Sequence, residues 1–463
     1  MSGVRTESRP PAVEPPAPRR AHPARGELLR GSAPWAGAAA LTGLAFLLVT
    51  EADSWQGSWG ETQAMLQLAA IVIIGPLAGA AGCWQGQREH RRRTHDLLAG
   101  AVRGPLARLL TAALPTALWA TAGYLTATAA ALLATWPYTS AGTPRLTVPL
   151  TDVVFIVSMT LIGHVTGALV RWRLLAPAFA AGAYVVLWLL PNTARETPAA
   201  RHLVPVAPEH LLAESVPVWW QPLATTGWTG GLAAAAVLAY TARRRWTALL
   251  PLAVALTAGA LLMQNGERMY RPDPLTQRQI CDESVRPAIC VRADYPGLLP
   301  QIKNALTDIN ARLEGVENLP ARFTDLDWGP KSADAHLPSL TPYGQSVVRG
   351  RLADPERYAW EAAMALLPSM DGGCDARLED NRVSRIDTAV EEWLAPDPWE
   401  FDELSHARAV GDTERVASIK AEQKALDAVS GRLRAMDQGE RRQWLSDYFA
   451  TVGTCDMDEV PAL

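Results

Sequence analysis

Five cysteines are the residues of this chain whose type and spacing point most directly to chemistry. Four of them follow residue 264, and an even number in one region is typical of disulfide bonding in an oxidising compartment. Cys281 and Cys290 are nine positions apart and flank a turn-rich loop, so we expect them to pair. Cys374 and Cys455 would then form a second disulfide. Four cysteines allow three pairings, however, and free buried thiols are the alternative.

Sequence motifs for catalysis are missing. No segment fits the phosphate-binding motif G-x-x-x-x-G-K-[ST], the zinc motif H-E-x-x-H or the nucleophile motif G-x-S-x-G. A zinc site at the cysteines is not expected, because there is no C-x-x-C and only His336 and His406 are near. Paired carboxylates such as Glu391 and Glu392 could form an acidic site, but they are more typical of a solvated acidic surface. We therefore expect no enzyme, no cofactor and no metal site. For residues 265–463 we favour a binding or gating role.

A cluster of arginines occupies one connection between apolar segments, residues 84–108. Leucines follow the arginines at partly helical spacing, which predicts a short amphipathic helix on the inner membrane surface. The alternative is an ordinary cytoplasmic cluster attracted to anionic lipid. The candidate site residues of this connection are Arg88, Arg91, Arg92, Arg93, Leu97, Leu98 and Arg103.

His164 is the ionisable residue that lies most clearly inside an apolar segment. Such residues at membrane depth often line a pathway, although a hydrogen bond between packed helices is the alternative. Asp152 and Arg145 are expected near the outer surface, in contact with water. Glycine pairs four residues apart, at 75 and 79 and at 163 and 167, have the spacing of helix-packing faces.

The charges divide the chain into two unlike halves. Residues 1–263 hold 20 basic and 12 acidic side chains, whereas residues 264–463 hold 23 and 35, which together give the net charge of −4. Few acids between long uncharged runs are typical of a membrane protein. This composition excludes a plain cytosolic enzyme, a disordered chain and a fibrous protein.

Seven apolar segments are candidates to cross a bilayer, because a spanning helix needs roughly 20 mostly apolar residues. The predicted fold is an α-helical polytopic membrane protein of about seven transmembrane helices. A mainly α-helical domain with a minor β element follows at residues 265–463. The predicted spans are 33–50, 64–83, 109–135, 153–170, 174–190, 228–241 and 246–264.

The arginines predict the orientation, since basic residues are retained on the cytoplasmic side. With the N-terminus in the cytoplasm, 17 arginines of residues 1–263 lie inside and three outside. Residues 265–463 are then extracytoplasmic, at the plasma membrane of a bacterium. Residues 1–30, rich in proline and arginine, are expected to be a disordered cytoplasmic tail ahead of an uncleaved first span.

Helical periodicity recurs along residues 265–463. Apolar positions between 296 and 313 predict an amphipathic helix, and residues 288–292 predict a short strand. A loop is expected at 395–401. Further helices are expected at 346–367, 383–394, 412–436 and 440–449.

The arginine-rich connection at 84–108 resembles the coupling-helix region of type-2 ATP-binding-cassette (ABC) permeases, in particular arginine-rich actinobacterial versions. The resemblance covers roughly residues 25–245 and is one of position and composition. It implies a separate ATPase subunit that docks on this connection, a homodimer or heterodimer in the lipid bilayer, and outward transport, with no role in nucleic-acid binding. It also implies partly re-entrant helices at 208–214 and 216–220.

The seventh span and the external domain depart from that family pattern. The segment from Cys281 to Pro296 resembles one that follows the last span in actinobacterial membrane proteins described as ABC permeases. An external domain could bind a substrate, a partner or the cell wall. The alternative function is therefore a non-transporting membrane receptor or envelope protein whose external domain binds a partner.

Overall fold

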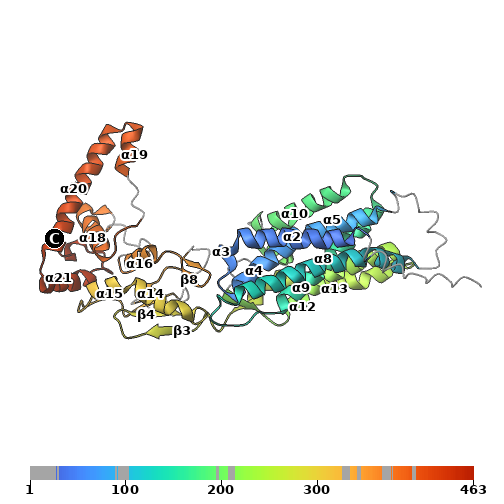
Figure 1. Ribbon diagram of the computed structural model, residues 1–463, viewed down its shortest axis with the longest axis horizontal. Coiled ribbons are helices and arrows are strands. Elements are labelled where there is room, and N and C mark those ends of the chain that lie inside the picture. The colour runs from blue at the N-terminus through green and yellow to red at the C-terminus, as the bar shows by residue number, and fades with distance from the viewer. Residues whose placement is uncertain are drawn as a thin grey trace, which may run out of the picture.

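The computed structural model describes residues 28, 31–88, 91, 104–193, 198–206, 214–325, 334–340, 346–367, 377, 379–398 and 403–463. They form a helical bundle over residues 33–265 and a C-terminal domain over residues 279–463, which lie end to end (Figure 1).

The bundle has the apolar helices of a membrane protein. Helices α10 (Leu175–Thr193) and α12 (Gln221–Thr241) occupy the positions of the fifth and sixth predicted spans. Helix α10 packs against α5 (Gly75–Gly86), and α12 packs against α9 (Thr147–Leu169). The helices among the described residues that are long and apolar enough to cross a membrane number five: Ala33–Thr50, Trp59–Gly86, Pro105–Thr135, Thr147–Leu169 and Arg245–Met269.

The second of these helices begins five residues before its predicted start, at Trp59, because a capping box closes its first turn. The Ser58 hydroxyl accepts a hydrogen bond from the Glu61 amide at 3.2 Å, and the Glu61 carboxylate accepts one from the Ser58 amide at 3.0 Å. The helix continues from α4 (Trp59–Ala69) through a π-helical turn, η1 (Ala70–Ile74), into α5.

Glycines let α5 and α9 pack with their backbones in contact. A Cβ atom added at Gly163 would lie 2.0 Å from the carbonyl oxygen of Gly79, and one at Gly167 would lie 2.2 Å from that of Cys83. The four-residue spacing noted in the sequence therefore does mark a packing face. A similar close approach joins α2 (Ala33–Thr50) and α8 (Pro105–Thr135), where Gly123 meets the carbonyl of Gly37.

The C-terminal domain is built on a four-stranded sheet in the order β3-β4-β5-β6. Strand β3 (Gln279–Asp282) pairs antiparallel with β4 (Ala288–Arg292), which confirms the predicted strand. The parallel strands β5 (Arg322–Thr324) and β6 (Ala335–His336) were not predicted. Ile289, Val291 and Phe323 are fully buried and form the centre of the hydrophobic core.

Helices cover this sheet and extend the domain. Three predicted helices are present: that at 383–394 is α18 (Asn381–Leu394), that at 412–436 is α20 (Thr413–Ala435), and that at 440–449 is α21 (Gln438–Ala450). The amphipathic stretch at 296–313 forms the 3-10 turn η5 (Pro296–Leu298) and two short helices, α14 (Leu299–Ala305) and α15 (Thr307–Arg312). In Figure 1, α19 and α20 form a hairpin that projects from the domain. The bounds of the remaining helices are α16 Pro355–Met364 and α19 Glu403–Val410.

Two predictions of helices are wrong in part. Residues 346–367 do not form one helix, because β7 (Val347–Val348) and β8 (Arg351–Leu352) make a hairpin whose turn places Gly350 at a positive φ of 70°. Helix α16 begins only after Asp354, which caps it by accepting from the Arg357 amide at 3.0 Å. The predicted re-entrant helix at 216–220 is replaced at its start by strand β1 (Ser215–Pro217), which pairs with β2 (Tyr270–Pro272). Most of the other such segment, 208–213, lies outside the described residues.

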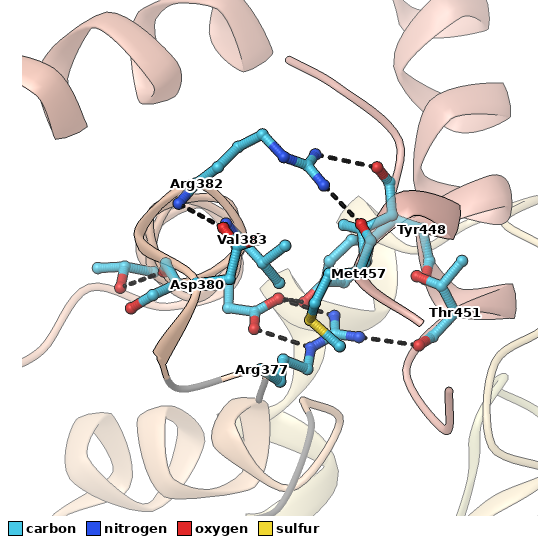
Figure 2. Close-up of polar contacts among 11 residues, drawn as sticks. Arg377, Asp380, Arg382, Val383, Tyr448, Thr451 and Met457 are labelled. Carbon is cyan, nitrogen blue, oxygen red and sulfur yellow. Dashed lines mark hydrogen bonds and ion pairs between the residues drawn. The ribbon is translucent and has the colours of Figure 1, made fainter. Parts of the chain in front are cut away.

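The last segment of the chain is held to α18 by two arginines. Arg377 donates hydrogen bonds to both Asp387 oxygens at 3.0 and 2.9 Å and to the Thr451 carbonyl at 2.8 Å. Arg382 reaches the carbonyls of Met457 and Val460 (Figure 2). These bonds fix the C-terminus against the domain core.

Candidate functional site

The predicted coupling connection begins at one end of the bundle, which we call the arginine end. Arg88 follows the last turn of α5, and the Arg91 guanidinium lies 3.7 Å above the ring of Trp84. Exposed arginines from the other connections lie at this end too: Arg171, Arg173, Arg243, Arg244 and Arg245. The predicted site residues Arg92, Arg93, Leu97, Leu98 and Arg103 lie outside the described residues.

Exposed tryptophans accompany these arginines. Trp84, Trp172 and Trp246 are each half or more exposed. Amphipathic indole rings favour the interface between membrane and water, so this end has the composition expected where a bundle leaves the bilayer.

His164 lies within α9 and is buried, and its Nδ1 atom has no hydrogen-bond partner among the described residues. Its backbone carbonyl faces Gly86 of α5. Among the described hollows, none is lined by this side chain. The structure thus places His164 at a close helix contact and leaves the pathway role a prediction.

Asp152 is not solvated, contrary to the prediction, and Arg145 is only partly exposed. Asp152 is 1% exposed and accepts a hydrogen bond at 2.6 Å from the Tyr124 hydroxyl of α8. Arg145 forms an ion pair with Asp273 and donates to the Ser215 carbonyl at 2.8 Å. Both partners come from distant parts of the chain, so only the tertiary structure reveals these contacts.

The bundle and the C-terminal domain meet in a charged cluster, which we call the junction. Glu61, 2% exposed at the start of α4, accepts a hydrogen bond at 2.5 Å from the hydroxyl of Tyr295, which follows β4. Its other oxygen belongs to the capping box with Ser58. One carboxylate therefore fixes the start of a membrane helix and also holds the C-terminal domain. The junction comprises Glu61, Arg145, Glu214, Asp273, Arg292, Asp294, Tyr295 and Asp325.

Arg292 is the central cation of the junction. Its guanidinium lies 2.7 Å from Glu214, 3.4 Å from Asp294 and 4.0 Å from Asp325, and its side chain is 8% exposed. Asp325 also accepts a hydrogen bond from the Arg292 amide at 3.0 Å. The parallel pairing of β4 and β5 explains the meeting, because Asp294 and Asp325 both follow the carboxyl ends of these strands.

Burial perturbs the acids on the domain side of the junction. Desolvation raises the pKa of Asp325 to about 6, against the opposing effect of its bond from the Arg292 amide. Desolvation also raises the pKa of Asp294, and the nearby Arg292 charge acts in the opposite direction. The pKa of Tyr295 is raised by burial and by the Glu61 charge, so this phenol stays a hydrogen-bond donor.

A small open hollow adjoins the junction. It has about 40 Å³ of free space and is lined by Ser58, Trp59, Arg145, Asp273 and Asp294 among others. This space suffices for a few water molecules, since one water needs roughly 10–15 Å³. Among the described residues, no group of three or more His, Cys, Asp or Glu side chains could hold a metal ion.

The cysteines agree with one predicted disulfide. Cys281 and Cys290 are bonded and face each other across β3 and β4. Cys83 is free and buried. Cys455 is disulfide-bonded, whereas its predicted partner Cys374 lies outside the described residues.

Sequence reasoning missed the junction, although one signal was present. Ser58 and Glu61 have the spacing of a capping box, and Glu61 directly precedes a long uncharged stretch. Nothing in the sequence pairs Glu61 with Tyr295, which is 234 residues away.

The geometry leaves two features that could carry function: an end of the bundle rich in exposed arginine and tryptophan, and a buried charged junction at the other end. Comparison of the chain with protein-family models, with curated proteins and with solved structures finds no match.

Proposed function

We propose that this chain is the membrane subunit of an ABC-type export system, whose ATPase is a separate chain that docks on residues 84–108. One observation carries the proposal. The arginines of several connections between helices gather at one end of the bundle, while the C-terminal domain lies beyond the opposite end (Figure 1). Such a division of charge supports a cytoplasmic docking surface and an extracytoplasmic domain.

The topology belongs to the same proposal. Seven spans, with α10 and α12 added to the five long apolar helices, carry the chain from a cytoplasmic N-terminus to an extracytoplasmic domain. An odd number of crossings is supported by the alternation of the helices, because α13 (Leu249–Asn265) ends beside the domain whereas α5 ends away from it (Figure 1). We propose that two such subunits form the homodimer or heterodimer.

Docking would use the arginines of residues 84–108, and not those of the other connections at the arginine end. An acidic or polar face on the ATPase would pair with these guanidiniums, which can form bidentate hydrogen bonds with carboxylates. The apolar side chains of Leu97 and Leu98 would supply the buried centre of the contact. This chain would contribute the pathway, and the ATPase would contribute nucleotide binding.

The test replaces the arginines of the connection. Arg91, Arg92 and Arg93 are changed together to Gln, and the full-length protein is purified from its host with associated chains identified by mass spectrometry. We expect the unaltered protein to retain an ATPase and the triple variant to lose most of it.

The matched control changes Arg243, Arg244 and Arg245 to Gln, which removes the same charge from the same end of the bundle. We expect this variant to keep the ATPase. If no ATPase accompanies the unaltered protein, or if the first variant keeps it, the coupling role is wrong.

A receptor or envelope protein is the second candidate, and the projecting α19–α20 hairpin favours it. Most of α20 is exposed. Its contacts with α18 include the bond from Arg385 to Glu422 at 2.6 Å and, near the C-terminal end of α20, the bond from Ser430 to Glu392 at 3.0 Å. This function predicts that removing residues 403–436 abolishes the cellular phenotype while the membrane part still accumulates normally. An unchanged phenotype would count against it.

A further inference from the structure

The two surfaces that meet at the junction carry charge of the same sign. The bundle side, with the segment after β2 that is tied to it, presents Arg145 against three carboxyl groups: Glu61, Glu214 and Asp273. The domain side presents Arg292 against two, Asp294 and Asp325. If every group is ionised, two cations face five anions in a largely buried interface.

The contacts across the interface do not balance this surplus. Arg292 and Glu214 form an ion pair, and the neutral hydroxyl of Tyr295 donates a hydrogen bond to Glu61. Arg349 of the domain also pairs with Asp53 of the bundle at 3.6 Å, which adds one charge of each sign and leaves the surplus unchanged. Oδ1 of Asp294 and Oδ1 of Asp325 are both buried and have no hydrogen-bond donor among the described residues. Asp325 is partly satisfied within its own domain, because its other oxygen accepts the bond from the Arg292 amide. Asp294 faces the carboxylates of the bundle side as well as Arg292, so the docked arrangement favours a neutral carboxyl at Asp294.

We propose that docking of the C-terminal domain on the bundle takes up a proton at Asp294, so that acid tightens the docking and alkali loosens it. The inference requires neither an ATPase nor transport, and therefore does not depend on the proposed function.

The direction follows from linkage. Burial raises the pKa of Asp294, and the charges of Glu214 and Asp273 on the bundle side raise it further, against the opposing effect of Arg292. The pKa of Asp325 is raised too, but the groups that act on it belong to the C-terminal domain, so its shift accompanies folding of that domain rather than docking. A group whose pKa is higher in the docked state binds protons more tightly there. Docking is therefore more stable at low pH, and this stability is lost as the pH rises through the raised pKa of Asp294 in the docked state.

The other charged groups around these carboxyls support the same sign. Asp294 faces Arg292 and also two anions of the bundle side, Glu214 and Asp273. Asp294 is close enough to act electrostatically on Glu61 as well. Asp325 faces Arg292 and Asp294, and its charge acts on the buried phenol of Tyr358. Separation of the two surfaces would remove the anions Glu61 and Glu214 from Asp294 and expose it to water.

Hydrogen exchange in the full-length protein tests the proposal. Protection of the amides in residues 270–298, corrected for the intrinsic exchange rate at each pH, is followed from pH about 8 to pH about 5. We expect protection to rise on acidification by up to about tenfold per pH unit for each proton taken up. Amides of α21, which lies away from the junction, report whether the domain stays folded.

Two variants separate the junction from the general charge of the domain. Asp294→Asn should raise protection at the alkaline end and flatten the pH dependence. The matched control Asp308→Asn removes an exposed carboxyl from α15 of the same domain and should leave the pH dependence unchanged.

An engineered disulfide tests whether proton uptake opposes separation of the C-terminal domain from the bundle. A Cβ atom at Gly297 of the domain would lie 3.6 Å from that of Ser140 in the bundle, inside the range of about 3.5–4.5 Å for a disulfide. In the oxidised Ser140→Cys, Gly297→Cys protein, protection should be high and independent of pH, and reduction should restore the dependence.

The proposal is overturned by protection that is flat or falls on acidification, or by an Asp294→Asn variant that keeps the slope. A calcium titration at pH about 8 tests the alternative, in which a bound metal cation neutralises the surplus carboxylates. If calcium ions alone raise protection and abolish the pH dependence, the junction binds a metal cation and the proton proposal is wrong.

Discussion

At the scale of single residues, buried cations hold distant parts of this chain together. Arg377 is 3% exposed and ties α18 to the turn after α21 through Asp387 and Thr451. Arg292 has the corresponding position at the junction, where it ties the sheet to Glu214. In both cases one planar guanidinium with several donors satisfies acceptors from separate elements.

Replacement of Arg377 should destabilise the C-terminal domain. In Arg377→Met, Asp387 loses both of its bonds from a guanidinium in a buried setting, which costs about 3 kcal/mol of the free energy of unfolding. The denaturant dependence of hydrogen exchange in α18 and α21 measures the loss. The control is Arg385→Met, which removes an exposed pair with Glu422 and should change little. Equal effects of the two substitutions would contradict the role assigned to Arg377.

At the scale of elements, the pairing of α5 with α9 organises the bundle. Small residues every four positions bring the two backbones into contact, so the pair leaves no room for a side chain at Gly163. Towards the N-terminus, α5 continues through η1 into α4, which carries Glu61 in its first turn. One long helix thus connects the junction with the arginine end.

A methyl group at this contact should weaken the bundle. Gly163→Ala would place a carbon 2.0 Å from the Gly79 carbonyl oxygen, so the helices must separate. We expect a loss of at least about 2 kcal/mol, typical of an overpacked core, measured as a lower thermal midpoint in detergent. Gly182→Ala in α10 meets no atom within 4 Å and should leave the midpoint unchanged or higher. A midpoint for Gly163→Ala that equals the unaltered one would show that the contact is absent.

At the scale of the whole molecule, the arginine end and the C-terminal domain lie at opposite ends of the bundle (Figure 1). A bilayer across the apolar helices would then separate them. The proposed orientation follows if the arginines remain in the cytoplasm.

Labelling in intact cells tests that orientation. In a Cys83→Ser background, a cysteine replaces either Lys424 of α20 or Arg244 of the arginine end, both exposed. A membrane-impermeant maleimide should label the first protein directly and the second only after permeabilisation. The reversed pattern would place the C-terminal domain in the cytoplasm and contradict both the topology and the proposed docking surface.

Local patterns predicted much of the fold. The helix at 33–50 and the strand at 288–292 have their predicted bounds, because apolar runs and alternation depend only on neighbouring residues. The helix predicted at 346–367 is wrong at its start, because the apolar residues there also suit the β7–β8 hairpin. The spacing of Cys281 and Cys290 was informative because only a short turn separates them.

The sequence by itself determined most of the helices and strand β4, the contrast between an arginine-rich membrane half and an acidic C-terminal half, and one disulfide. Each of these depends on composition or on residues close together in the chain. Only the tertiary structure decided that Glu61 meets Tyr295, that Asp152 meets Tyr124, and that Arg292 gathers three carboxylates. Such contacts join residues that are far apart in sequence, and their energies depend on burial, which no local pattern specifies.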